Sequence, residues 1–169
     1  MISIRPRRPD DLPACVTVLR QVHLADGYPQ NWPADPAAWL ATPALRSAWV
    51  GAQGEVVAGH VSLFELPDGS DLPSLAGRSD LLLLSRLFVA PDRRGDGLAW
   101  RLLRLATEQA GSLGQRAVLE VEDGAAAAIR LYERAGWRLL ARRPGRWLDR
   151  NGQHPMVRVY LAGVTPPAG

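Results

Sequence analysis

The chain has 169 residues, with 20 basic side chains that are all arginine, 17 acidic side chains and a net charge of +3. This length suffices for one domain with a complete hydrophobic core, and we expect a single domain over residues 1–164. The lone cysteine, Cys15, excludes a disulfide framework. No apolar run approaches membrane-spanning length and no signal core opens the chain, so we predict a cytoplasmic protein without a membrane partner.

The N-terminal part of the chain is predicted to form a short strand followed by a helix. Ile2 and Ile4 alternate with polar residues, which indicates the strand. Asp10 and Asp11 suit the first turn of a helix that ends near Gly27. The expected buried side chains of this helix are Leu12, Cys15, Val16, Leu19 and Val22.

Residues 28–43 are rich in proline and aromatic side chains. A short helix is expected to begin at Pro36, because proline is favoured at the first helical position. We expect Trp39 to pack this segment onto the sheet. Tyr28 and Trp32 either pack in the same way or line a pocket for the acceptor substrate, and the sequence leaves both options open.

Two strands at residues 47–52 and Val56–Phe64 are predicted to form a hairpin around the turn at Gly54. His60 has no second ligand at metal-binding spacing, so we interpret it as structural. Residues 66–80 are expected to be a long loop, and such loops are often functional or mobile. Its acidic side chains either attract a cationic amine or lie solvated at the surface; they are Glu65, Asp68, Asp71 and Asp80.

A strand, a glycine loop and a helix follow in direct succession over residues 81–111. The apolar runs at residues 81–84 and 87–90 indicate a buried strand. After the loop at residues 93–97, apolar residues recur at helical spacing; they are Leu98, Leu102, Leu103, Ala106 and Ala110. Free amides and the positive end of the helix dipole make such a loop a binding site for an anion such as phosphate.

Two common phosphate loops do not fit this sequence. A P-loop requires lysine at the helix start, and the chain has none. The dinucleotide fingerprint requires a small residue where Trp100 stands. The pattern Val89-x-Pro91 followed by Arg94-x-x-Gly97-x-Ala99 instead resembles the acyl-CoA loop of the GCN5-related N-acetyltransferase (GNAT) superfamily. In that family the backbone amides of the loop hold the pyrophosphate of acetyl-CoA; the alternative is an ordinary glycine turn.

The remaining elements are a strand at residues 117–121, a helix at residues 125–135, and strands at residues 137–141 and Met156–Leu161. Gly136 follows the helix, where glycine is the preferred residue. Arg142, Arg143, Arg146 and Arg150 are interpreted as a charged hairpin loop, because no aromatic ladder or recognised motif supports nucleic-acid binding. Residues 165–169 are predicted to be a frayed, disordered tail.

A second motif strengthens the resemblance. The segment Ala128-Ile129-x-Leu131-Tyr132-x-x-x-Gly136-Trp137 is similar to the family's Ala-Ile-x-Leu-Tyr-x-x-x-Gly-Phe segment. The predicted element order is also that of the family. The resemblance therefore implies an α/β (α+β) acyl-CoA acyltransferase fold, with a mixed, mostly antiparallel sheet of about seven strands, about four flanking helices and splayed fourth and fifth strands.

The resemblance also assigns roles to individual residues. Tyr132 would lie near the sulfur of CoA and protonate the leaving thiolate, which a phenol can do; alternatively it packs by its ring. The pantetheine arm would lie along Leu87, Phe88 and Val89, where one amide would polarise the thioester carbonyl. The complete set of implied cofactor-binding residues is Leu87, Phe88, Val89, Arg94, Gly95, Asp96, Gly97, Leu98, Ala99 and Tyr132.

Transfer to an amine also requires a base, because the amine arrives protonated. Glu120 lies in Leu119-Glu120-Val121, and strand alternation points it to the face opposite its neighbours. Some family members that acetylate protein N-termini carry a base at this spacing before the tyrosine. The alternative is a carboxylate paired with an arginine; Glu122, Asp80 or a water chain could also serve.

Two residues depart from the family pattern. Ala125 stands where the family often has an asparagine that helps to hold the cofactor, so that contact would be weaker or made otherwise. Asp96 adds a negative charge to the loop, so it must point outward or cap the helix. Arg93, Arg94 and Arg101 could offset its charge.

We therefore predict an acetyl-CoA-dependent N-acetyltransferase that needs no metal and acts on a primary amine of a small molecule or peptide. The alternative is a non-catalytic acyl-CoA-binding sensor or scaffold of the same fold. Nucleic acid is not an expected partner. The sequence identifies neither the acceptor amine nor the oligomeric state, and it leaves a homodimer open.

Overall fold

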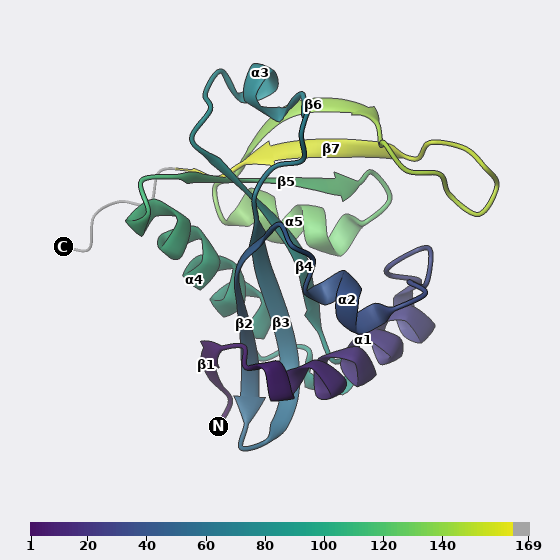
Figure 1. The fold of residues 1–169 in the computed structure, drawn as a ribbon, viewed down its shortest axis with the longest axis vertical. Coiled ribbons are helices and arrows are strands. Elements are labelled where there is room, and N and C mark those ends of the chain that lie inside the picture. The colour runs from purple at the N-terminus through teal and green to yellow at the C-terminus, as the bar shows by residue number, and fades with distance from the viewer. Residues whose placement is uncertain (164–169) are drawn as a thin grey trace.

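In the computed structural model, residues 1–163 are described, and they form one seven-stranded sheet flanked by helices (Figure 1). The strands are β1 (Ser3–Pro6), β2 (Leu45–Gln53), β3 (Val56–Phe64), β4 (Leu81–Val89), β5 (Arg116–Glu122), β6 (Arg138–Pro144) and β7 (Met156–Leu161). The helices are α1 (Leu12–Asp26), α2 (Pro36–Leu40), α3 (Leu72–Ala76), α4 (Leu98–Ser112) and α5 (Ala126–Arg134). The predicted tail at residues 165–169 lies outside the described residues.

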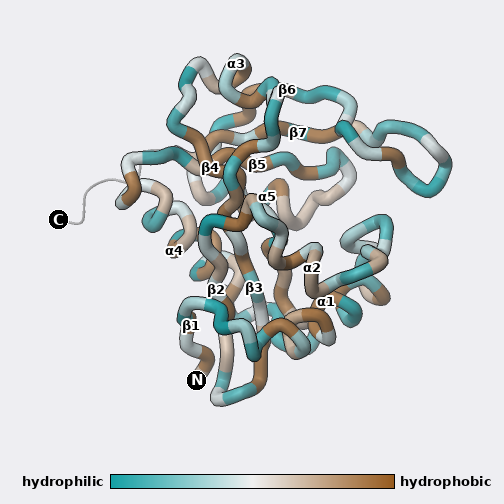
Figure 2. Tube along the Cα trace, viewed as in Figure 1, coloured by the Kyte–Doolittle hydropathy of each residue, from teal (hydrophilic) through white to brown (hydrophobic). Residues whose placement is uncertain are grey.

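The strand order is β1-β2-β3-β4-β5-β7-β6. Only the β4–β5 pair is parallel, and the other neighbours are antiparallel. The prediction of a mixed, mostly antiparallel sheet is therefore confirmed. At one edge β6 is mostly hydrophilic, whereas its neighbour β7 is hydrophobic (Figure 2). Arginines on this edge strand oppose pairing with another sheet.

Helices cover both faces of the sheet. α4 and α5 pack on one face, while α1 and α2 pack on the other (Figure 1). The five apolar residues predicted for α4 are all buried, and each fully buried leucine stabilises the fold by about 1.5–3 kcal/mol. In α1 the prediction was partly wrong: Val18 is buried, whereas Leu12 and Val16 are only half-buried.

The segment at residues 66–80, predicted to be a loop, contains the short helix α3. The sequence did not reveal it because five residues with a proline at the start show no helical periodicity. Leu72 of α3 is buried against Leu81 of β4 and Val118 of β5. This helix raises the number of α-helices to five in the described part of the chain.

β4 and β5 separate soon after they begin. Their pairing is limited to Leu81–Leu83 opposite Arg116–Val118. Further along β4, the three-residue step from Ser85 to Phe88 faces a two-residue step on β3, which is the geometry of a β-bulge. Arg86, inside the bulge, has a φ of 53°. The predicted splaying of the fourth and fifth strands is thus confirmed.

Candidate active site

The loop before α4 has the geometry of an anion-binding turn. Gly95 and Gly97 have φ values of 96° and 76°, and this left-handed region is strained for residues with a Cβ atom. No atom lies within 4 Å of the position of a Cβ at either glycine. Within residues 1–163, no backbone amide from Gly95 to Ala99 donates a hydrogen bond, and no side chain caps α4. These amides are therefore free to bind a phosphate group.

The charged side chains of this loop are only partly arranged as predicted. Arg94 forms a bidentate ion pair with Asp26 at the end of α1. Both side chains are about two-fifths exposed, so the pair contributes at most about 1 kcal/mol. Asp96 is exposed and does not cap α4. Arg101 does not pair with Asp96 to offset its negative charge, because the Arg101 guanidinium donates to the carbonyl of Ile2 at 3.1 Å.

β4 leads from its short pairing with β5 directly to this loop. In the described residues, the edge of β4 that faces β5 has no strand partner after Leu83. Leu87 is half-buried there, while the side chains of Phe88 and Val89 are buried. The backbone of these residues is therefore placed so that an extended chain can lie beside it.

Tyr132 of α5 is buried with a relative exposure of 7%. Its ring packs against Trp137 and Tyr160, with centroids 5.8 and 6.2 Å away. Burial raises the pKa of the phenol, and the neighbouring Tyr28 raises it further. Because its pKa is raised, the Tyr132 hydroxyl is protonated at neutral pH. It has no side-chain hydrogen-bond partner among residues 1–163, so it is free to donate its proton.

Tyr28, which the sequence left undecided, lies in the loop between α1 and α2. Its ring contacts Trp39 edge-on with a centroid distance of 6.3 Å. Tyr28 as a whole is 37% exposed, but the packing around its hydroxyl raises its pKa to about 12; the Arg86 cation opposes this shift and Glu122 adds to it. Tyr28 also raises the pKa of Tyr132, so the charge states of Tyr28, Arg86, Glu122 and Tyr132 are linked.

Gln30, two residues later, was not singled out by the sequence. Its amide donates to the Glu122 carboxylate at 2.7 Å. The contact joins the α1–α2 loop to the end of β5, two segments far apart in the chain. No local motif signals such a contact.

Glu120 is half-buried on β5 at the point where β4 and β5 have separated. Arg143 of β6 donates to its Oε1 at 2.8 Å. The same guanidinium donates to Asp71 at 2.9 Å. Burial tends to lower the pKa of Arg143, but Glu120 and Asp71 outweigh this and raise it. The arginine-paired alternative is thus what the structure shows, although Oε2 of Glu120 has no partner among the described side chains.

The other candidate acid and the predicted hairpin arginines lie elsewhere than expected. Asp80 is held by Arg78 at 2.6 Å, before the paired end of β4 and away from the opening. Arg142 and Arg143 belong to β6 rather than to a hairpin loop, which corrects the prediction. Arg142 pairs with Asp123. Their charges are therefore largely neutralised.

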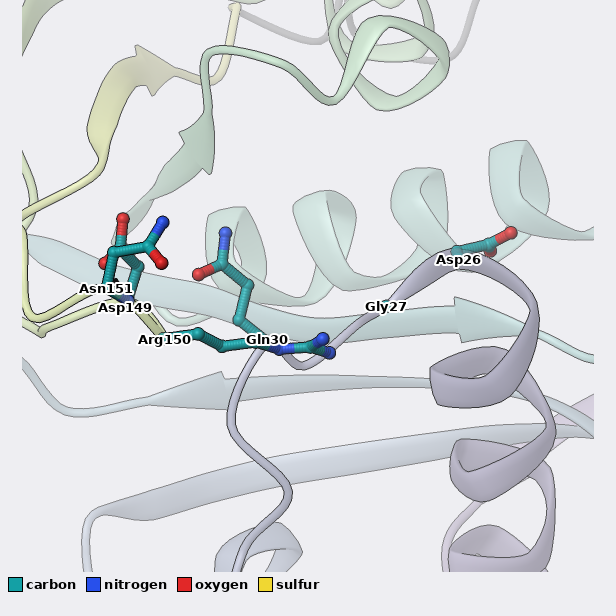
Figure 3. A pocket seen from close by; sticks show the side chains of 6 residues that line it. All are labelled: Asp26, Gly27, Gln30, Asp149, Arg150 and Asn151. Atoms are coloured by element: carbon teal, nitrogen blue, oxygen red, sulfur yellow. Dashed lines mark hydrogen bonds between the residues drawn. The ribbon is translucent and has the colours of Figure 1, made fainter.

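A hollow of about 330 Å³ lies between the α1–α2 loop and the β6–β7 loop (Figure 3). Its lining residues are Asp26, Gly27, Gln30, Asp149, Arg150 and Asn151. The side chain of Arg150 extends from the β6–β7 loop toward the α1–α2 loop (Figure 3). Asn31 ties the two loops together by donating to the carbonyl of Leu148 at 2.8 Å. Gln30, which lines the hollow, is the residue that donates to Glu122 at the end of β5.

In residues 1–163 no group of three or more histidine, cysteine, aspartate or glutamate side chains could hold a metal ion. No helix in the described range is both long and apolar enough to span a bilayer.

Comparison with known proteins agrees with this geometry. The model of the acetyltransferase (GNAT) family matches residues 15–137. The uncharacterized N-acetyltransferase YjgM of Escherichia coli is 32% identical over 157 residues, covering 81% of this chain and 86% of YjgM. The L-methionine sulfoximine/L-methionine sulfone acetyltransferase of Pseudomonas aeruginosa is 37% identical over 70 residues, covering 37% of this chain and 41% of that enzyme.

A solved structure shows the same fold. Arabidopsis thaliana NAA60 in complex with acetyl-CoA has a TM-score of 0.74 and 23% identity, covering 95% of this chain and 97% of NAA60. The family match spans most of this chain and includes both motifs as well as the opening between β4 and β5. This protein therefore belongs to the acetyltransferase (GNAT) family and is an N-acetyltransferase.

Proposed function

We propose that this enzyme transfers an acetyl group from acetyl-CoA to a primary amine by direct attack. The observation that carries the proposal is the early separation of β4 and β5 beside a loop of unpaired amides. The amides of residues 95–99 would hold the pyrophosphate, and the edge of Leu87 to Val89 would hold the pantetheine arm. Acetyl-CoA supplies the activated acetyl thioester when it is bound.

Main-chain groups beside the opening would also support the transfer. An amide of the strand segment Leu87 to Val89 would polarise the thioester carbonyl, and a preorganised donor of this kind contributes about 3 kcal/mol. Holding the amine against the thioester supplies most of the remaining acceleration.

Tyr132 is proposed to protonate the departing thiolate. A general acid must be protonated at the working pH, and the raised pKa of the buried phenol ensures this. The absence of a competing side-chain partner within residues 1–163 leaves the hydroxyl free to donate to the sulfur.

Glu120 is proposed to receive the proton of the incoming ammonium, directly or through water. Its Oε1 is occupied by Arg143, but Oε2 is free of side-chain partners in the described residues. The Arg143 contact fixes the orientation of the carboxylate. Glu122 is the second candidate for this role, because it lies near Tyr28 and is held by Gln30.

The acceptor amine would enter the site past the α1–α2 loop and the β6–β7 loop. The hollow lined by Gln30 and Arg150 opens there, and Gln30 also binds Glu122. Relatives act on different amines: the Pseudomonas enzyme is named for amino-acid derivatives, and another neighbour of the same fold, at a TM-score of 0.71 and 19% identity, is named as a ribosomal-protein-S18-alanine N-acetyltransferase. The acceptor is therefore proposed only as an amine.

A thiol-release assay with acetyl-CoA and a panel of amines tests the proposal. We expect amine-dependent release of free CoA together with an increase in thermal stability on binding. Ligand at about 100 times its dissociation constant stabilises by about 2.7 kcal/mol, so binding can be measured separately from turnover. Stabilisation without thiol release for any amine would instead support the non-catalytic module and contradict the proposed reaction.

A further inference from the structure

Arg86, in the bulge of β4, is an arginine enclosed by aromatic rings. Its guanidinium carbon lies 4.1 Å from the ring centroid of Trp39 and 4.6 Å from that of Phe64. Nη1 donates to Ser85 at 2.9 Å. Nε is buried and has no hydrogen-bond partner among the described residues.

Arg86 also lacks a counterion within residues 1–163, where no carboxylate forms an ion pair with it. Burial lowers the pKa of its guanidinium, and Tyr28 only partly opposes this. Charges withdrawn from water are normally paired, because an unpaired buried charge is costly. The aromatic faces supply part of the compensation, and Ser85 accepts from Nη1, but Nε is left without an acceptor among the described residues.

The surrounding backbone is shaped to hold this side chain. Arg86 is the one residue other than glycine with a positive φ in the described chain, and such conformations persist only where the surroundings enforce them. Nδ1 of buried His60, on the neighbouring strand β3, lies 2.8 Å from the carbonyl oxygen of Arg86 and holds the backbone of the bulge in place. A built position of this kind for an uncompensated cation points to a ligand.

The position of Arg86 relates it to the acetyl-transfer site. It directly precedes Leu87, where the proposed thioester arm begins. Trp39 contacts both Arg86 and Tyr28, and Gln30, two residues after Tyr28, donates to Glu122. These contacts relate a positive and a negative group to the same α1–α2 loop. An acceptor that carries an amine and an anionic group close together complements this arrangement.

We propose that Arg86 binds the carboxylate of the acceptor, so that the enzyme acetylates amino acids or amino-acid-like amines that carry a free carboxylate. The guanidinium would donate to the carboxylate while the amine faces the acidic end of β5. This assignment rests on the proposed acetyl transfer and specifies its substrate class. The competing explanation is that Arg86 only packs the aromatic segment around α2.

The test compares L-amino acids with their α-carboxamides as acceptors in the thiol-release assay. A charge-assisted contact predicts that kcat/KM for the acids exceeds that for the amides by roughly 10- to 100-fold in the wild type. In Arg86→Gln this ratio should fall to about one, because kcat/KM should drop for the acids and stay unchanged for the amides. Arg86→Lys keeps the charge without the planar fork and should recover part of the preference.

Arg20→Gln is the matched control. The Arg20 guanidinium also lies over an aromatic ring, that of Trp32 at 4.7 Å, but on the exposed surface of α1. It should leave the preference for acids unchanged. Circular dichroism shows whether each variant is folded. If Arg86→Gln is unfolded, the acid-to-amide ratios of kcat/KM for the wild type and for Arg86→Lys provide the test. A wild type without preference, or an equal loss for acids and amides in the variants, would overturn the assignment.

Failure of the assignment is distinguishable from failure of acetyl transfer. If no amine is turned over, the proposed transfer is wrong, and the carboxylate site is then tested by thermal unfolding. N-acetyl amino acids should raise the melting temperature of the wild type but not of Arg86→Gln, whereas their carboxamides should raise neither. No shift in the wild type would refute the carboxylate site.

Discussion

His60 and Arg86 connect two neighbouring strands at the point where the sheet opens. Nδ1 of His60 lies 2.8 Å from the carbonyl oxygen of Arg86, and Nε2 lies 2.9 Å from Nη1 of Arg7. Because a guanidinium can only donate, Nε2 must be the acceptor and Nδ1 must carry the proton. A neutral histidine of defined tautomer therefore holds the bulge of β4.

Acid is expected to weaken the fold through His60. Burial lowers the pKa of His60 to about 3, from 6.5. Between these values the unfolded state binds one proton more than the native state, so stability falls as pH falls, by up to about 1.4 kcal/mol per pH unit. Urea unfolding from pH 7 to 4 measures this slope. His60→Gln, which keeps a donor and an acceptor, should show a shallower slope, whereas His154→Asn in the exposed β6–β7 loop should not.

Removal of the Tyr132 hydroxyl is expected to separate chemistry from binding. Tyr132→Phe keeps the ring contacts with Trp137 and Tyr160, so the fold and CoA binding should be retained. A lost general acid lowers kcat by roughly 10²- to 10⁴-fold. Tyr160→Phe is the control, because its hydroxyl binds Glu133 at 2.8 Å. Steady-state kinetics and CoA titration test this, and unchanged turnover in Tyr132→Phe would remove Tyr132 from the mechanism.

Glu120→Gln is expected to lower kcat and to alter the pH–rate profile. The amide cannot accept the proton of the ammonium, so the acidic limb assigned to the base should disappear. Asp71→Asn disturbs the same Arg143 ion-pair network but leaves the carboxylate of Glu120 intact, so it should keep the wild-type profile. If Glu120→Gln keeps that profile as well, Glu122→Gln becomes the decisive variant.

Substitution of Gly97 is expected to weaken cofactor binding through the backbone. Gly97→Ala meets no atom within 4 Å, so its cost, about 1–2 kcal/mol, comes from the left-handed φ of 76°. We expect a higher KM for acetyl-CoA and a lower melting temperature. Gly111→Ala, also in open space but within α4, should instead stabilise the protein by roughly 0.5–1 kcal/mol and leave KM unchanged. Equal KM values for both variants would argue against a cofactor role of the loop.

Asp26→Asn is expected to strengthen CoA binding. The substitution removes the partner of Arg94 and one negative charge beside the loop. Exposed pairs contribute about 0–1 kcal/mol, so the dissociation constant should fall by up to about five-fold. The gain should diminish in high salt, because screening weakens exposed charge interactions. Calorimetric titration at two salt concentrations measures both effects, and weaker binding by Asp26→Asn would show that the ion pair supports the loop.

The resemblance to the GNAT superfamily implied the mixed sheet with its splayed fourth and fifth strands. The residues themselves predicted the strand, glycine loop and helix around Gly97 and the position of Tyr132 on its helix. These features depend on local periodicity and on residues adjacent in the chain, which a sequence displays directly. Helix α3 was not predicted because five residues carry too little of that periodicity.

The tertiary structure decided which side chains meet. It paired Glu120 with Arg143, joined Gln30 to Glu122, and enclosed Arg86 between Trp39 and Phe64. Each contact joins segments that are distant in the chain, and it exists only because strand register and the bulge of β4 place them together. A one-residue change of register turns a side chain to the other face of a sheet, so such contacts can be assigned only when all the strands are in place.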